Sequence, residues 1–343
     1  MPPIIDELPL SIYDPDAWTI SLVQERTPTV PILWNLPPQL NALSVFEFIQ
    51  QLGAIHNSNA GPIIIDFSRN SWVEPSGLAI LAALISYVHS HHHAIRLEGL
   101  DQCQNLTYWQ RSNFFNTLGF QSEESFFRHD RSTTLLEISR CTCDFDADEI
   151  SKRFGALANR LQPESARLVS YLAQEGLRNV VDHSTVAGYA AAQIYPNKHI
   201  IEFAIADAGI GIRKSLARSP VHTFDNDQEA IENALKLGIS SRFHLGVSNP
   251  NRSNNLGIGL HATDRLVRHH RGLWLLASGS ALRIVDETGT AHYRRLPINL
   301  PGVFSSIRLP LATHAAETDQ VLRQIRQEHT TLVKAFARKR HPH

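Results

Sequence analysis

Residues 172–184 read LAQEGLRNVVDHS, and this stretch decides the fold predicted for the C-terminal half of the chain. Glu175, Asn179 and His183 are spaced four residues apart, so a helix places them in one stripe along its surface. Leu177 and Val180 belong to an adjacent apolar face that predicts packing on a core. A solvated helix face is the ordinary alternative for such a stripe. The prediction of a ligand site therefore depends on the motifs that follow.

A second motif combines a strand with an acid and a glycine turn. Residues 199–206 read HIIEFAIA, an apolar run typical of a strand, and lead directly into Asp207-Ala208-Gly209-Ile210-Gly211. Glycine has no side chain, so a ligand can approach the backbone closely there. We expect the strand, the aspartate and the turn to form a second side of the same site.

A third motif places glycines before a helix. Residues 254–260 read NNLGIGL and open an apolar helical pattern that continues through Ala262, Leu266 and Val267. Backbone amides at the beginning of a helix point outward and favour a negatively charged group. The spacing therefore predicts a phosphate-binding turn.

In this order, the three motifs resemble the N box and the two glycine boxes of the GHKL ATPases, which include histidine-kinase catalytic domains, gyrase B, Hsp90, MutL and anti-sigma-factor kinases. The resemblance extends over about residues 145–312. It includes the closing segments 272–278 and 302–310, which are similar to the last hairpin of the family. It implies a Bergerat-type α/β sandwich with a mixed, mostly antiparallel sheet.

The resemblance also implies ATP and Mg²⁺ as cofactors and a role for each motif. Asn179 is expected to coordinate Mg²⁺, Glu175 to activate the attacking water or hydroxyl, and Asp207 to accept a hydrogen bond from the adenine amino group. The other nucleotide contacts that it implies are His183, Gly209, Gly211, Asn255, Gly257, Ile258, Gly259 and Leu260. Asp182 stands where histidine kinases carry a basic residue and gyrase-type members an acid, so its role stays open.

The polar connection between the glycine boxes corresponds to the ATP lid of the family, at about residues 213–256. Connections of this length within a domain are usually functional or mobile. Residues 228–237 carry a short helical pattern, and Ser240, Ser241 and Arg242 are candidates to reach phosphate. An ordinary surface arginine is the alternative for Arg242.

The first third of the chain alternates between strand and helix patterns. Strands are predicted at 61–67 and 94–99, and helices at 78–85 and in a segment that reaches 114–120. This α/β alternation resembles a STAS domain, the fold of anti-sigma-factor antagonists, over about residues 28–125. The resemblance implies that this region recognises a protein.

One position departs from the phosphorylatable STAS pattern. The loop of those members reads Asp-Ser-Ser/Thr-Gly, and here Pro75, preceded by Glu74, occupies the place of the phosphoacceptor. Ser76 is the neighbouring hydroxyl. We expect Ser76 to cap the following helix, because serine is a preferred N-cap, and phosphorylation of Ser76 is the alternative.

The predicted organisation has four parts: an N-terminal extension at 1–27, a STAS-like domain at 28–130, a GHKL ATP-binding domain at 131–312 and a basic helical tail at 313–343. The tail ends in Arg338-Lys339-Arg340 after an apolar helical pattern. It is expected to pack on the ATP-binding domain or on a partner, with a solvated helix as the alternative.

Composition restricts the class of protein. The chain has 343 residues, 43% of them hydrophobic, which is enough for two cores, and its net charge of -1 argues against a nucleic-acid partner. No apolar run reaches the roughly 18 residues of a membrane span, and the N-terminus lacks the pattern of a signal peptide. Three cysteines fit reduced thiols. We therefore expect a cytoplasmic protein with no membrane partner.

A STAS-like and a GHKL-like region in one chain together imply partner switching. The predicted function is a Mg-ATP-dependent regulatory switch that acts on a protein partner, either a regulatory factor or a STAS or anti-sigma-type protein; a homodimer is also compatible. The corresponding enzyme is a GHKL ATPase with slow hydrolysis or a serine/threonine-type protein kinase. A non-enzymatic nucleotide-sensing adaptor is the alternative. A histidine kinase is disfavoured, because residues 148–165 contain no histidine.

Overall fold

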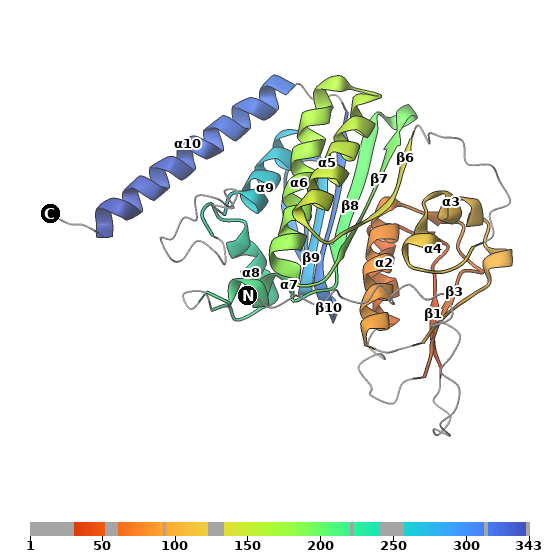
Figure 1. The fold of residues 1–343 in the computed structure, drawn as a ribbon. Coiled ribbons are helices and arrows are strands. Elements are labelled where there is room, and N and C mark those ends of the chain that lie inside the picture. Colours follow the sequence, from red (N-terminus) through yellow and green to blue (C-terminus); the bar gives the residue numbers. More distant parts are fainter. Residues whose placement is uncertain are drawn as a thin grey trace, which may run out of the picture.

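The computed structural model describes residues 31–51, 61–91, 94–122, 134–219, 223–239, 257–311 and 315–340. These residues form a mixed α/β structure in which a helix, α2 (Pro75–Ser90), lies between two sheets (Figure 1). The α/β class predicted from the sequence is therefore confirmed.

The N-terminal sheet is parallel. It contains β1 (Ile32–Asn35), β3 (Ile63–Asp66) and β5 (Ile95–Glu98) in the order β1-β3-β5. The short strands β2 (Gln39–Leu40) and β4 (Trp72–Val73) form a separate parallel pair. The helices of this region are α1 (Ser44–Ile49), α2, α3 (Leu106–Arg111) and α4 (Phe114–Thr117). The strands expected at 61–67 and 94–99 correspond to β3 and β5.

The second sheet has five strands in the order β6-β7-β8-β10-β9. Their bounds are β6 (Leu135–Cys141), β7 (Gly188–Tyr195), β8 (Ile200–Asp207), β9 (Leu273–Val285) and β10 (Ala291–Pro310). Every described pairing in it is antiparallel, so the expectation of a mixed sheet is wrong for this region. The closing hairpin expected from residues 272–278 and 302–310 is present as β9 and β10.

Helices cover both faces of the five-stranded sheet. On one face lie α5 (Asp144–Asn159), α6 (Ala166–Asn179) and α9 (Gly259–His269), and on the other lies α2 (Figure 1). An antiparallel sheet commonly leaves one face in water and then alternates between apolar and polar residues. With both faces covered, β8 is instead apolar along nearly its whole length, and every residue from Ile201 to Asp207 is buried.

Helix α2 is apolar around its whole circumference, as expected for a helix enclosed on all sides. Twelve of its 16 residues are buried. It begins with Pro75 at its first position, and Glu74 occupies the N-cap position in an extended conformation. Ser76 is completely buried in the first turn, so the expectation that Ser76 caps this helix is wrong. Its hydroxyl is also enclosed from a modifying enzyme in this structure.

Small side chains allow α2 to approach the five-stranded sheet. Ala191, Ala204, Ala206 and Ala277 belong to the same buried cluster as the α2 side chains, and that cluster continues into the N-terminal sheet through Ile63 and Ile65. The N-terminal and C-terminal regions therefore share one hydrophobic core. The predicted boundary near residue 130 lies outside the described residues.

The C-terminal helix α10 (Ala315–Arg340) lies against α6 and α9. Its residues Val321, Leu322 and Ile325 are buried in the core that also holds α6 and α9. The tail thus packs on the region predicted to bind ATP, and the solvated-helix alternative does not describe this part of α10. Among the helices that the structure describes, none is long and apolar enough to cross a membrane.

Candidate functional site

A cavity of about 690 Å³ lies on the face of the five-stranded sheet that carries α6 and α9. Its walls come from α6, β8, β9 and β10, from α7 (Gly211–Leu216), from the turn that opens α9, and from α10. Cavities of roughly 300–1,000 Å³ are typical of small-molecule and cofactor sites. The volume therefore suits a ligand of nucleotide size.

The three residues of the predicted helical stripe line this cavity together. The regular α-helix, however, ends at Asn179, and Val180–Ser184 form a wider π-helical turn that carries His183. Single π turns inside helices are frequent at functional sites. Glu175, Asn179 and His183 thus share one cavity, although the helix between them is not regular as the spacing predicts.

Glu175 lies where α6 meets the beginning of α9. A Cβ atom added to Gly259 would be 2.4 Å from Glu175 Oε2, so a larger residue at this position would displace the carboxylate. Burial raises the pKa of Glu175, while the Arg178 charge and a hydrogen bond from Tyr171 oppose the rise. A carboxyl group with a raised pKa is a better proton acceptor than an ordinary surface glutamate.

Asp207 ends strand β8 and also lines the cavity. Its Oδ1 accepts a hydrogen bond from the Gly209 amide at 2.9 Å. Burial raises the pKa of Asp207 to about 6, and the hydrogen bonds to Gly209, Ser184 and Val303 only partly offset this effect. Asp207 therefore offers a buried hydrogen-bond acceptor to a ligand.

The two glycines after Asp207 have different surroundings. Gly211 has a φ of +75° and lines the cavity, as expected. Gly209 does not line it: a Cβ atom there would lie 2.0 Å from the Ser184 carbonyl oxygen. In this structure Gly209 lets the turn pack against the π-helical turn, and the ligand contact expected of Gly209 stays a prediction.

The turn that opens α9 forms another wall of the cavity through Gly257, Ile258, Gly259 and Leu260. Gly257 has a φ of +70°, and a Cβ atom there would clash with the backbone of residues 238 and 239. The N-cap residue Ile258 gives no side-chain hydrogen bond to the first turn. The amides of this helix end therefore face the cavity without a side-chain cap. Asn255 lies outside the described residues.

The cavity also has an apolar wall, which suits a flat hydrophobic group. Its members on the sheet and on α7 are Phe203, Ile205, Ile212, Leu216, Trp274, Leu276, Val303 and Ile307. Ligand sites generally combine such walls with a few converging polar groups. Here the polar groups include those of α6, Asp207 and the α9 turn.

The predicted lid is partly helical. Its described portion contains α7 and α8 (Asp227–Ala234), the second of which confirms the helical pattern expected near 228–237. Asp227 accepts hydrogen bonds from both the amide and the hydroxyl of Ser280, so α8 is fixed to β9. Ser240, Ser241 and Arg242 lie outside the described residues.

Helix α10 contributes cavity residues that the sequence interpretation missed. They are Leu322, Ile325, Arg326, His329 and Thr330. The apolar spacing of the tail predicted a helix with a packing face. Nothing in that spacing identified the partner surface, because the residues that contact α10 are far away in the sequence.

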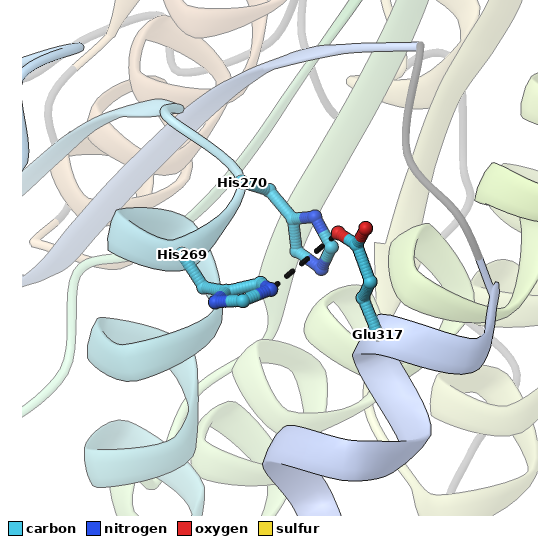
Figure 2. A group of neighbouring side chains, drawn as sticks. All are labelled: His269, His270 and Glu317. Carbon is cyan, nitrogen blue, oxygen red and sulfur yellow. Dashed lines mark ion pairs between the residues drawn. The ribbon is translucent and has the colours of Figure 1, made fainter.

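A cluster at the junction of α9 and α10 holds the beginning of α10 in place. His269, His270 and Glu317 offer atoms that lie within 4.8 Å of one another, a combination that metal ions accept (Figure 2). Glu317 pairs with His269 Nε2 at 3.5 Å, and His270 Nε2 lies 3.1 Å from the Thr318 hydroxyl. Because these contacts already engage the polar groups, we interpret the cluster as an anchor between the helices.

A second charged cluster lies between α2 and the five-stranded sheet. Arg308 Nη2 is 2.7 Å from Glu202 and 3.3 Å from Glu74, so one guanidinium serves two carboxylates. Burial raises the pKa of Glu74 to about 7, the charge of Glu202 adds to the rise, and Arg308 opposes it. Nearby, Tyr108 donates a 2.5 Å hydrogen bond to Gln193 across the same interface.

Comparison with protein-family models and with curated proteins found no match to this chain.

Proposed function

We propose that this chain is an ATP-binding regulatory protein with a GHKL-type nucleotide site in its C-terminal region. One observation carries the proposal: Glu175, Asn179, Asp207 and the Gly257–Gly259 turn, taken from three separate motifs, line a single cavity of about 690 Å³. If the polar stripe on α6 were only a solvated helix face, the other two motifs would not be expected to lie beside it.

The donors and acceptors of the cavity suit the parts of ATP. The buried Asp207 carboxylate would accept a hydrogen bond from the adenine amino group, and the apolar wall would cover the ring. The uncapped beginning of α9 would receive the phosphates. The Asn179 amide oxygen would hold the Mg²⁺ that accompanies ATP, and this ion would neutralise phosphate charge.

The proposed chemistry at this site is phosphoryl transfer to water or to a hydroxyl group of a protein. Glu175 has the raised pKa and the cavity position expected of a general base, and Tyr171 and Arg178 orient its carboxylate. A site that binds ATP without turnover would make the protein a nucleotide-sensing adaptor instead.

We place the protein-partner function in the N-terminal layer. Strands β7 and β8 pack against α2, and β8 ends at Asp207. Through α2 and the common core, the N-terminal region packs directly against β8, the strand that ends at the proposed adenine acceptor Asp207. A STAS-like partner or a regulatory factor remains the proposed target.

Calorimetry of ATP binding with and without Mg²⁺ tests this function. We expect Mg-dependent binding to the wild-type protein and loss of the Mg²⁺ dependence in Asn179→Ala. Release or transfer of labelled phosphate by the wild-type protein, and not by Glu175→Gln, would establish an enzyme. Absence of ATP binding to the wild-type protein contradicts the proposal.

A further inference from the structure

We propose that Arg326, on the C-terminal helix α10, binds a phosphate group of the nucleotide. This inference rests on the function proposed above and assigns part of the site to a segment outside the three motifs. Arg326 lines the cavity together with Tyr171 and Glu175 of α6.

The position of Arg326 identifies the part of the ligand that it meets. Burial raises the pKa of Tyr171, the charge of Glu175 adds to this, and the charge of Arg326 opposes it, so the two cavity-lining side chains interact electrostatically. The Tyr171 hydroxyl donates a hydrogen bond to Glu175, and Glu175 lies against Gly259 where α9 begins. Helix α10 contacts both α6 and α9, so Arg326 lines the cavity beside the two helices that supply Glu175 and the glycine turn.

The charge of Arg326 is available to a ligand. Other charged residues of α10 are engaged with the body of the protein: Asp319 pairs with Arg167 at 2.8 Å and Glu328 with Arg265 at 2.6 Å. Within the part of the chain that the structure describes, Arg326 forms no salt bridge. Among the described residues, the second arginine that lines the cavity is Arg178, which already lies 3.5 Å from Asp148.

The contacts of α10 hold Arg326 over the cavity. The helix is attached to α6 through Asp319 and to α9 through Glu328, on opposite sides of Arg326 in the sequence. At its beginning, the anchor of His269, His270 and Glu317 fixes it to the end of α9 (Figure 2). A guanidinium carried on a fixed helix loses less freedom on binding and presents a planar fork that matches phosphate oxygens.

The experiment compares the binding of Mg-ATP and of adenosine to the full-length protein by calorimetry. We expect Arg326→Ala to weaken ATP binding by about tenfold or more, because a hydrogen bond to a charged group contributes roughly 1.5–3 kcal/mol. Adenosine affinity should not change. The ATP affinity of Arg326→Lys should lie between those of the wild-type protein and Arg326→Ala, since lysine keeps the positive charge and loses the planar guanidinium. Arg323→Ala is the matched control, because Arg323 is an exposed residue of the same helix that does not line the cavity.

Unchanged ATP affinity in Arg326→Ala would overturn the assignment, and so would an equal loss of ATP and adenosine affinity, which indicates a packing role. Asp207→Asn separates this failure from failure of the proposed function. If the wild-type protein binds ATP and Asp207→Asn binds it more weakly, the nucleotide site stands and only the role of Arg326 is lost. If the wild-type protein binds no adenine nucleotide, both proposals fail.

Discussion

The Glu175 carboxylate lies directly against the Cα of Gly259, so the middle of α6 and the first residue of α9 meet at one end of the cavity. A methyl group on Gly259 would be 2.4 Å from Oε2. The two motifs that contain these residues are separated by a long stretch of chain. Their contact is what turns a polar stripe and a glycine turn into a single site.

This contact predicts the effect of Gly259→Ala. Alanine is favourable in a helix, and the atom that it meets is the end of a side chain that can move, so the free energy of unfolding should change by less than about 1 kcal/mol. The displaced Glu175 carboxylate should lose its position, and phosphoryl transfer should fall by at least about tenfold. Thermal unfolding measures the change in stability, and a labelled-phosphate assay measures phosphoryl transfer. Full turnover in this variant would show that the position of Glu175 is unimportant.

Glu175→Gln tests the role of the carboxylate itself. The amide preserves the size of the side chain and removes the proton acceptor, so we expect turnover to fall by roughly 10²–10⁴-fold while Mg-ATP affinity is retained. Single-turnover kinetics measure the loss of turnover, and calorimetry measures the Mg-ATP affinity. Turnover at the wild-type rate would remove Glu175 from the role of general base.

The charged cluster between α2 and the sheet predicts a dependence of stability on pH. The pKa of Glu74 is raised from 4.5 to about 7, so the folded state binds this proton more tightly than the unfolded state does. The resulting stabilisation is complete below about pH 4.5 and is lost as the pH rises through about 7. Above that pH, two negative carboxylates face the single guanidinium of Arg308, with Lys198 as a weaker positive neighbour and Tyr108 and Tyr195 beside them.

Glu74→Gln is the variant that checks this pH dependence. Glutamine resembles the protonated carboxyl group and cannot lose the proton, so the decline in the free energy of unfolding between pH 5 and 8 should become shallower. Denaturant unfolding across that range measures the slope. Glu149→Gln provides a control on an exposed side chain. An identical slope in Glu74→Gln and the wild-type protein would contradict the assignment.

The shared core predicts that a larger side chain at Ala204 is poorly tolerated. Ala204 is fully buried in the cluster that also contains the residues of α2, and overpacking at such a site typically costs about 1–3 kcal/mol. Ala204→Leu should therefore lower the stability by that amount. Ala156→Leu, at an exposed position of α5, should change it by less than about 0.5 kcal/mol. Equal stability of the two variants would argue against close packing of α2 on β8.

The sequence predicted those parts of the molecule that depend on local patterns. The strand before Asp207, the glycine turn before α9 and the final hairpin are all local features, and the structure contains them. The π-helical turn that contains His183 was not predicted, because it depends on how residues 180–184 meet Gly209 and the neighbouring strands. The burial of Ser76 was missed because it results from α2 lying between two sheets, and the contribution of Arg326 was missed because α10 returns from the far end of the chain.

The central claim is that the cavity recognises adenine through Asp207, and titration of Mg-ATP into the wild-type protein and into Asp207→Asn tests it most directly. The Gly209 amide donates to Oδ1, so in the variant it favours the amide oxygen there, and the NH₂ group takes the place of Oδ2, where the proposed adenine contact would lie. Two donors then face each other, and we predict that ATP affinity falls by roughly tenfold to a hundredfold. Equal ATP affinity in the two proteins, or no ATP binding to the wild-type protein, would contradict the account.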